Sequence, residues 1–255
     1  MTTNFHVIIP ARMSSTRLPN KMLADVCGLP LIIRVAHQSL KSQATSVTVA
    51  TDDSKIYKVC QEYGLNVIMT AIKHQSGTDR IAEAAQKLNL ASNEIIVNVQ
   101  GDEPLIAPEL INQLAAFIAT KNTPIATIAH AINSTEEIFN PNVVKVVLDN
   151  NNIALYFSRA PIPYYRDGYT KTEISLSTQI DVLRHIGIYA YKVEFLNLYA
   201  NLLPCNLEQI EALEQLRAIY YGHKIAVMQA DQAPAAGVDT LADLERVRTI
   251  IANQV

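Results

Sequence analysis

VIIPARMSSTRLPNK, residues 7–21, joins an apolar run of strand type to a loop that carries three cations. The apolar run stops at Pro10, and Arg12, Arg17 and Lys21 follow it. In an open parallel sheet, ligands bind outside the carboxyl ends of the strands, so we expect these cations to face a bound anion. The planar fork of donors on Arg and the compact charge of Lys suit a triphosphate. A solvated basic loop is the alternative that this stretch alone leaves open.

The same loop excludes two common kinds of phosphate site. A P-loop needs two glycines with four residues between them and then Lys with Ser or Thr, and a dinucleotide fingerprint needs G-x-G-x-x-G after the first strand. Residues 7–21 contain no glycine. They offer the hydroxyls of Ser14, Ser15 and Thr16 instead, which suit phosphate oxygens. Interpretations as a P-loop kinase or a Rossmann dehydrogenase therefore fail.

The composition is that of a globular protein with one large core. The chain has 255 residues, of which 49% are hydrophobic. A net charge of −3 gives no field that attracts nucleic acid, and no apolar run approaches the length of a membrane span. Cys27, Cys60 and Cys205 are widely separated, which fits neither a disulfide framework nor a zinc site. We expect a cytoplasmic protein without a nucleic-acid partner and without membrane insertion.

In the first half of the chain, strand-like runs alternate with helical patterns. The strand-like runs are 7–9, 47–50, 67–69 and 95–99, and helices are expected to begin near Pro30, Thr51, Ser76 and Pro108. This alternation is typical of right-handed parallel crossovers. The expected fold is α/β, a Rossmann-like three-layer sandwich.

An acidic pair follows the most strand-like run of the chain. Gln100-Gly101-Asp102-Glu103 ends the run at 95–99, which places Asp102 at the carboxyl edge of the sheet. A carboxylate opposite a basic phosphate loop suits Mg²⁺, which takes oxygens from one or two carboxylates and from substrate phosphates. An ordinary Gly-Asp turn after a buried strand is the alternative.

The segment HQSGTDR, residues 74–80, stands at the start of a predicted helix. Its Ser, its Gly and the exposed backbone donors suit a base or a ribose, and Asp79 complements the helix dipole. An ordinary capped helix start is the alternative interpretation.

The second half of the chain changes rhythm. Its strand-like runs are 125–132, 143–148, 153–157 and 184–191. Asn-rich turns separate the first three, so we expect a mixed, partly antiparallel extension of the sheet. The polar loop from Ser158 to about Asp181 is a candidate flap or dimer contact. In the last run, His185 and Tyr189 share one face by the period of two.

Residues 208–221 have the pattern of one amphipathic helix that ends at Gly222. Asp239 stands just before the final helical pattern. It is expected to be an N-terminal acid or cap of that helix, or a second acid that faces Asp102.

Several of these stretches together resemble one family over nearly the whole chain. They are VIIPARMSSTRLPNK, HQSGTDR, VNVQGDEP, FNPNVVKVV, LYFSRAPIP, LRHIGIYAY, LEQLR and GVDT, in that order. In this combination they resemble the 3-deoxy-manno-octulosonate (Kdo) cytidylyltransferases, the CMP-Kdo synthetases. Similar sequences usually read RLPGK, whereas here Asn20 replaces the Gly. Asn tolerates the left-handed region of backbone space, so we expect the loop to keep its shape.

The resemblance implies a GT-A-like nucleotidyltransferase fold and the conversion of CTP and Kdo into CMP-Kdo and pyrophosphate. It further implies Mg²⁺ as cofactor, a homodimer, and a role in lipopolysaccharide inner-core synthesis. Residues 1–255 would form a single nucleotidyltransferase domain, with 125–200 as a sugar-binding and dimerisation extension.

The resemblance also implies roles for individual residues. The catalytic residues would be Arg12 and Lys21, which hold the triphosphate, and Asp102 and Asp239, which hold Mg²⁺. The nucleotide and the sugar-facing side would be lined by Ala11, Ser76, Gly77, Asp79, Arg80 and Gln100. The Kdo would be contacted by Arg159, Arg184, His185, Tyr189, Glu214 and Gln215, with the cations facing its carboxylate and the Glu its hydroxyls.

Three alternatives stay open at this point. The sugar is Kdo or its 8-amino analogue, because one polar substituent can be accommodated by small loop changes. CMP-sialic acid synthetases share the fold and the chemistry, but their first loop looks like IPARGGSKG, from which ARMSSTRLP departs. A nucleotide-sensing module without catalysis would be expected to lack the acids, yet Asp102 and Asp239 are both present.

Overall fold

The computed structural model describes residues 3–13, 15, 17–74, 76–169, 181–231, 235 and 237–253. The strands are β1 (Phe5–Ala11), β2 (Asp25–Val26), β3 (Leu29–Pro30), β4 (Ser46–Thr51), β5 (Asn66–Met69), β6 (Ile95–Asn98), β7 (Ile125–Ala131), β8 (Lys145–Leu148), β9 (Ala154–Ser158), β10 (Leu183–Lys192) and β11 (Ile225–Gln229). The helices are the 3-10 turn η1 (Lys21–Leu23) and α1 (Leu31–Ser39), α2 (Ser54–Glu62), α3 (Gly77–Lys87), α4 (Pro108–Ala119), α5 (Thr135–Phe139), α6 (Val193–Tyr199), α7 (Asn206–Glu211), α8 (Gln215–Tyr220) and α9 (Leu241–Ala252).

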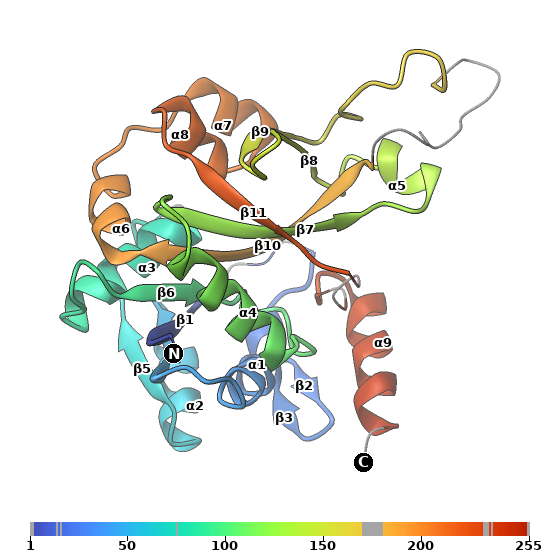
Figure 1. Ribbon diagram of the computed structural model, residues 1–255. Coiled ribbons are helices and arrows are strands. Elements are labelled where there is room, and N and C mark those ends of the chain that lie inside the picture. Colours follow the sequence, from blue (N-terminus) through green and yellow to red (C-terminus); the bar gives the residue numbers. More distant parts are fainter. Residues whose placement is uncertain are drawn as a thin grey trace.

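In the described part of the chain, nine strands form one mixed sheet, and β2 and β3 form a separate hairpin (Figure 1). The order along the sheet is β11-β7-β10-β6-β1-β4-β5, with β8 beside β10 and β9 beside β8. β1 runs parallel to β4 and β6, whereas β10 runs antiparallel to β6 and β7. The predicted mixed sheet with a small antiparallel extension is confirmed, and β8 and β9 provide the extension.

Helices cover both faces of the sheet because its central strand is apolar on both sides. In β1, Val7 and Ile9 are fully buried on one face, in a core cluster with residues of α1, α2 and α4. Ile8 is fully buried on the other face, in a cluster with residues of α3, α6 and α8. A parallel strand that is covered on both faces reads as a continuous apolar run. The first residues of the opening stretch therefore specify three layers.

β10 has an irregular register where it passes β7. Ile186 pairs with Ile128 and Tyr189 pairs with Thr127, so three positions along β10 correspond to one position along β7. Such bulges bend a strand and re-aim side chains, often beside active sites. His185 and Tyr189 share a face, as predicted, and their ring centroids lie 5.3 Å apart.

The prediction of one helix over 208–221 is wrong. α7 ends at Glu211 and α8 begins at Gln215, because Ala212 adopts the left-handed conformation with φ 50° and ψ 51°. The Arg159 guanidinium donates from Nε to the carbonyl of Glu211 and thereby binds one of the carbonyls at the end of α7. The helical period continues across the break, so the sequence pattern gave no sign of it.

Other local predictions have mixed outcomes. Asn20 adopts φ 57°, which confirms that it takes the left-handed conformation of the usual Gly. Pro30 ends β3 and precedes α1 instead of standing in its first turn. The short elements α5 and α6 and the β2–β3 hairpin were not predicted, because so few residues carry little periodicity. Of the predicted flap, residues 170–180 lie outside the described residues. None of the described helices is long and apolar enough to cross a membrane.

Candidate active site

A divided cleft opens at the carboxyl ends of β1 and β6. Its larger compartment has a volume of about 810 Å³ and its smaller one about 460 Å³. Pro10, Arg12 and Gln100 line both compartments, so they stand at the junction. This is the edge of a doubly wound sheet where ligands bind.

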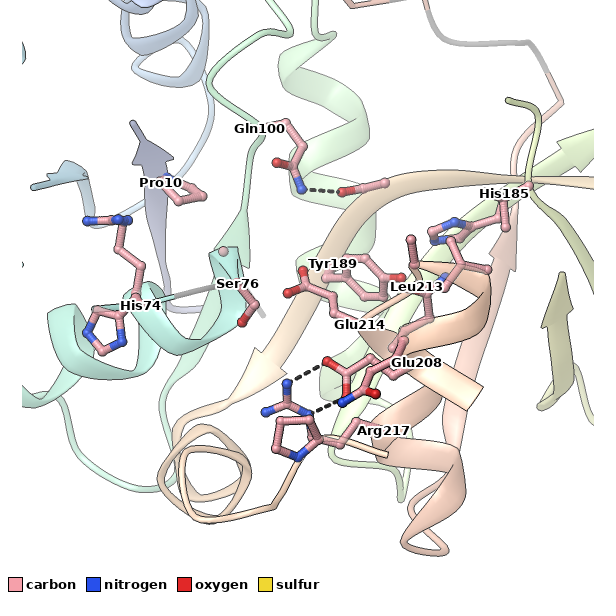
Figure 2. A pocket seen from close by; sticks show the side chains of 18 of the residues that line it. Pro10, His74, Ser76, Gln100, His185, Tyr189, Glu208, Leu213, Glu214 and Arg217 are labelled. Carbon is pink, nitrogen blue, oxygen red and sulfur yellow. Dashed lines mark hydrogen bonds and ion pairs between the residues drawn. The ribbon is translucent and has the colours of Figure 1, made fainter. Parts of the chain in front are cut away.

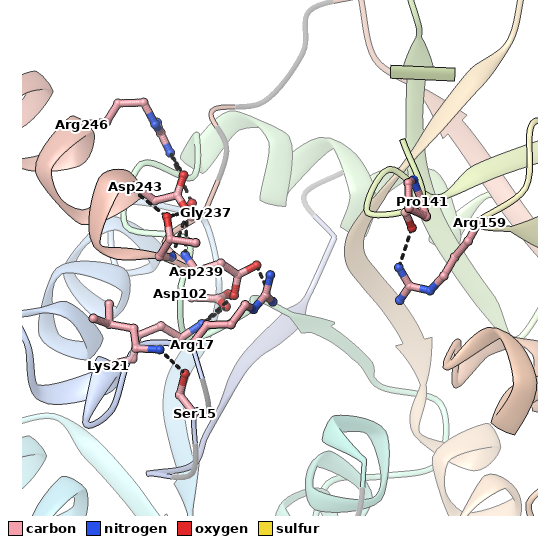
Figure 3. A network of polar contacts seen from close by, with 12 residues as sticks. Ser15, Arg17, Lys21, Asp102, Pro141, Arg159, Gly237, Asp239, Asp243 and Arg246 are labelled. Carbon is pink, nitrogen blue, oxygen red and sulfur yellow. Dashed lines mark hydrogen bonds and ion pairs between the residues drawn. The ribbon is translucent and has the colours of Figure 1, made fainter. Parts of the chain in front are cut away.

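The smaller compartment is built around Lys21. Its ammonium lies 2.7 Å from a carboxylate oxygen of Asp102 and 3.1 Å from one of Asp239, and Arg17 lies 3.0 Å from the other oxygen of Asp239 (Figure 3). Lys21 is only 6% exposed. Burial by itself disfavours its charge, but the two carboxylates outweigh burial and raise the pKa of Lys21 above 10.5. The compartment thus places two cations and two acids within contact of one another.

Two close backbone contacts bring these acids together although they stand far apart in sequence. The Val238 N–H donates to the Asp102 carbonyl at 2.8 Å. A Cβ on Gly237 would lie 3.0 Å from that same carbonyl oxygen, and a Cβ on Gly101 would lie 3.0 Å from the Pro10 carbonyl oxygen. At such distances a Cβ would force the facing backbone carbonyl to shift, so glycine favours the close approach at both positions.

Asp239 does not cap the last helix, so that interpretation of the sequence is wrong. The N-cap of α9 is Thr240, whose hydroxyl accepts from the Asp243 N–H, and the Asp243 carboxylate accepts from the Thr240 N–H in return. This capping box satisfies the first turn without Asp239. The side chain of Asp239 is therefore available to the cleft.

Glu103 is a further acid next to this compartment. Burial, strengthened by the negative charge of Asp102, raises the pKa of Glu103 to about 7. Its carboxylate lies close to Gly237 rather than in the lining of either compartment.

One wall of the larger compartment is the start of α3. Ser76 is the N-cap of α3 and accepts from the Asp79 N–H at 3.1 Å. Arg80 lines the compartment but is only 3% exposed. Its guanidinium donates to Thr70 Oγ1 and, at 2.7 Å, to the Asp52 carboxylate. The ion pair with Asp52 compensates the buried charge of Arg80.

The opposite wall is β10 (Figure 2). Arg184 pairs with Glu137 at 2.7 Å, and Gln100 Nε2 donates to the Gly187 carbonyl at 3.0 Å. His185 has a pKa lowered to about 3 by burial, so its ring is neutral at physiological pH. Tyr189 is 4% exposed and lines the compartment beside this ring.

The third wall comes from the broken helix pair α7 and α8. Burial raises the pKa of Glu214. Hydrogen bonds from Ser76 and Thr78, at the start of α3, partly offset this rise. Arg217 donates to the Glu208 carboxylate, with Nε at 2.8 Å. These side chains close the compartment on the side away from the smaller one (Figure 2).

Comparison with known proteins gives the family. The profile of a family described as cytidylyltransferases matches residues 6–225. A 3-deoxy-manno-octulosonate cytidylyltransferase of Neisseria gonorrhoeae is 54% identical over 248 residues, which cover 97% of this chain and 98% of the relative. The chain belongs to the 3-deoxy-manno-octulosonate cytidylyltransferase family.

Further comparisons give the same family or the same fold. The 3-deoxy-manno-octulosonate cytidylyltransferase of Aliivibrio salmonicida is 54% identical over 249 residues, 98% of this chain and 99% of the relative. The solved structure of a CMP:2-keto-3-deoxy-manno-octonic acid synthetase complexed with CTP superposes with a TM-score of 0.89 at 40% identity, covering 99% of this chain and 100% of the other. A cytidylyltransferase from Leptospira borgpetersenii, with a TM-score of 0.63 at 16% identity, shares the fold and covers 99% of this chain and 88% of the other.

The cleft brings together most of the residues that the sequence singled out. The larger compartment is lined by Ala11, Arg12, Ser76, Gly77, Arg80, Gln100, Arg184, His185, Tyr189, Glu214 and Gln215. The smaller compartment is lined by Arg12, Lys21, Gln100, Asp102 and Asp239. Of the loop hydroxyls, Ser15 lines the smaller compartment, while Ser14 and Thr16 lie outside the described residues.

Two of the predicted residues lie elsewhere. Arg159 donates to backbone carbonyls, at 2.9 Å to Pro141 and at 2.7 Å to Glu211, and is not part of the cleft lining (Figure 3). Asp79 lines a neighbouring cavity, where its carboxylate lies 3.7 Å from Arg217. Both contact residues that line the larger compartment, Arg159 the carbonyl of Ala212 and Asp79 the guanidinium of Arg217.

Sequence reasoning missed several residues that support the site. Asp52 stands two residues after a predicted strand, and Arg217 belongs to the LEQLR stretch, so position and motif were the available signals. Thr70, Thr127 and Glu208 carried no local signal, because their importance depends on partners distant in sequence.

Proposed function

We propose that this cytidylyltransferase transfers the cytidylyl group of CTP to the anomeric hydroxyl of Kdo. The hydroxyl oxygen attacks the α-phosphorus of CTP and releases its proton, the bond from that phosphorus to the bridging oxygen breaks, and pyrophosphate leaves with the electron pair. The product is CMP-Kdo, a precursor for the lipopolysaccharide inner core. Such catalysis is mostly positioning and charge stabilisation.

The division of the cleft is the observation that carries this proposal. The smaller compartment gathers Arg12, Arg17 and Lys21, the cations that suit a triphosphate. The larger one offers Arg184, Glu214 and other polar side chains, which suit a hydroxylated sugar acid. The α-phosphorus and the attacking hydroxyl would meet at the junction that Pro10, Arg12 and Gln100 form.

Asp102 and Asp239 fit Mg²⁺, which belongs to the proposal. Among the described residues, no group of three or more His, Cys, Asp and Glu side chains gathers around one point. Mg²⁺ needs only one or two carboxylates when a triphosphate supplies further oxygens. When bound there, Mg²⁺ would offset the charge that develops on the phosphate oxygens.

The assembly and the location of the enzyme remain predictions. We propose a homodimer in the cytoplasm, with residues 125–200 taking part in sugar binding and dimerisation. Arg184, His185 and Tyr189 support the sugar-binding part, because they belong to this range and line the larger compartment. Sedimentation would test the dimer, and fractionation of cells would test the location.

The reaction is tested by incubating the purified protein with CTP, Mg²⁺ and one sugar at a time, and measuring pyrophosphate. We expect release with Kdo and little with N-acetylneuraminate, and 8-amino-Kdo serves as the third substrate. Preferred use of 8-amino-Kdo would change the assigned sugar. Release with N-acetylneuraminate alone, or none with any sugar, would contradict the proposed function.

Arg184 provides a sharper test of the sugar side. Arg binds a carboxylate through two parallel hydrogen bonds and Lys does not, so Arg184→Lys should raise the KM for Kdo more than that for CTP. Arg34→Lys is the matched control, because Arg34 binds the carbonyls of Val26 and Cys27 away from the cleft. A defect of Arg184→Lys confined to CTP would move this residue to the nucleotide side.

A further inference from the structure

Thr127 lies behind the β10 wall of the cleft and is fully buried. Its hydroxyl oxygen lies 2.7 Å from the carbonyl oxygen of Ile188 and 3.1 Å from that of Ile186. The same oxygen lies 3.0 Å from Nε2 of His185. One hydroxyl thus contacts two carbonyl oxygens of the β10 bulge and one ring nitrogen.

The single proton of this hydroxyl decides which way each hydrogen bond runs. Carbonyl oxygens only accept, and a threonine hydroxyl donates once and accepts with its lone pairs. If the proton pointed at His185, both carbonyl oxygens would face the lone pairs of Thr127 at 2.7 Å and 3.1 Å. The proton therefore lies toward the bulge, and the ring nitrogen must be the donor.

We infer that Thr127 is a positioning residue that fixes His185 as its Nε2–H tautomer, so that Nδ1 is a hydrogen-bond acceptor for a ligand in the cleft. Two aromatic contacts hold the plane of the ring: an edge contact with Phe157 at a centroid distance of 4.9 Å and a tilted contact with Tyr189 at 5.3 Å. In the part of the chain that the structure describes, Nδ1 forms no hydrogen bond. Burial lowers the pKa of His185 to about 3, which keeps Nδ1 unprotonated.

The tautomer determines what His185 recognises. An acceptor nitrogen binds a hydroxyl and repels a carboxylate, whose oxygens are also acceptors. His185 is thus a partner for a hydroxyl of the sugar acid and not for its carboxylate. This assignment to the sugar rests on the proposed function, whereas the tautomer follows from the contacts of Thr127 alone.

Nitrogen NMR reads the tautomer directly. In protein labelled with ¹⁵N-histidine, we expect a pyrrole-type signal for Nε2 and a pyridine-type signal for Nδ1 of His185, identified by its absence in His185→Gln. The opposite pattern, with the proton on Nδ1, would overturn the inference. This measurement needs no substrate, so it stands whether or not Kdo is turned over.

Two variants of Thr127 test its role toward the substrate. Thr127→Val keeps the shape and removes the hydroxyl, so the ring loses its fixed tautomer and the KM for Kdo should rise about tenfold, the scale of one lost hydrogen bond, with the KM for CTP unchanged. Thr127→Ser keeps the hydroxyl and should retain both the wild-type tautomer and the wild-type KM for Kdo. Equal defects in the two variants would reduce Thr127 to a packing role.

If Thr127→Val does not fold, the wild-type spectrum and the serine variant still decide. A wild-type Nδ1–H signal, or a serine variant whose tautomer differs from wild type, would contradict the inference. Absence of turnover with Kdo in the wild-type enzyme would contradict the proposed function and leave the tautomer to be read from the spectrum.

Discussion

Lys21 and Lys145 are both buried, yet one faces carboxylates and the other faces backbone carbonyls. Lys21 lies between Asp102 and Asp239, at the edge of the smaller compartment. Lys145 is fully buried in β8, and its ammonium donates to the carbonyls of Asn140, Val143 and Arg159. Lysine is thus buried in two kinds of environment, and its pKa is raised in one and lowered in the other.

The difference follows from the charge of the partners. The carboxylates of Asp102 and Asp239 raise the pKa of Lys21 against the effect of burial. Burial lowers the pKa of Lys145, and the nearby Arg159 guanidinium lowers it further. Carboxylates that bind a lysine can also bind Mg²⁺ carried by a phosphate. Three carbonyls that accept all three protons of an ammonium leave it no proton for another partner, so its role is structural. A buried lysine is therefore a functional candidate when its partners are themselves ionic.

Asp102→Asn should have the largest effect on activity. It removes one charge from the ionic cluster of Arg17, Lys21, Asp102 and Asp239 and keeps the shape of the side chain. We expect kcat/KM with CTP and Kdo to fall by at least about a hundredfold, on the scale of losing a charged group at a phosphoryl-transfer site. The measurement is turnover against Mg²⁺ concentration. Asp53→Asn is the matched control, since Asp53 caps α2 away from the cleft and Asn caps about as well. Near-normal turnover of Asp102→Asn would show that the ionic cluster takes no part in the reaction.

Lys21→Ala comes next. The loss of a charge-assisted contact with the triphosphate should lower kcat/KM about ten- to a hundredfold. Because Lys21 is buried between Asp102 and Asp239, the free energy of unfolding should also fall, by about 1 to 3 kcal/mol. Kinetics and urea unfolding measure the two effects. Lys58→Ala, at an exposed lysine of α2, is the control that should change neither.

Lys145→Met should reverse the balance between stability and activity. It leaves three buried carbonyls without their donor, so the free energy of unfolding should fall by about 3 kcal/mol. The folded variant should keep kcat/KM within about tenfold of wild type, since Lys145 is not part of the cleft lining. An activity loss as deep as that of Lys21→Ala would mean that the structural lysine also serves the reaction.

The pH dependence of stability should show the smallest effect and the clearest sign. The pKa of Lys145 is lowered in the folded state, so below pH 10.5 the folded protein releases this proton before the unfolded chain does. Because the unfolded chain then binds more protons, the free energy of unfolding rises with pH. The contribution of Lys21 is constant up to 10.5 and is lost only above it, through its raised pKa. Urea unfolding of wild type and of both lysine-to-methionine variants measures the two contributions.

Over the pH range below 10.5 in which Lys145 begins to lose its proton, wild type should gain stability relative to Lys145→Met. Relative to Lys21→Met, wild type should gain nothing over the same range. Parallel curves for the two variants would show that the two lysines do not differ in their environment.

The fold was largely predictable because its information is local. The run 7–9 is apolar on both faces, so it required cover on both sides, and the helix starts predicted near Thr51 and Ser76 marked two of the helices that supply it. The break at Ala212 was not predictable, because the period of the helix runs through it and the contact of Arg159 comes from the residue after β9.

The candidate site divides in the same way. The order of the residues alone shows that cations follow β1, that acids follow β6 and precede α9, and that the motifs resemble one family of cytidylyltransferases. The folded chain was needed to show that Lys21 contacts Asp239, 218 residues away, and that Arg159 binds carbonyls outside the cleft. The physical reason is that residue type and spacing are properties of a segment, whereas an ion pair depends on close approach of two segments, which the glycines at 101 and 237 permit here.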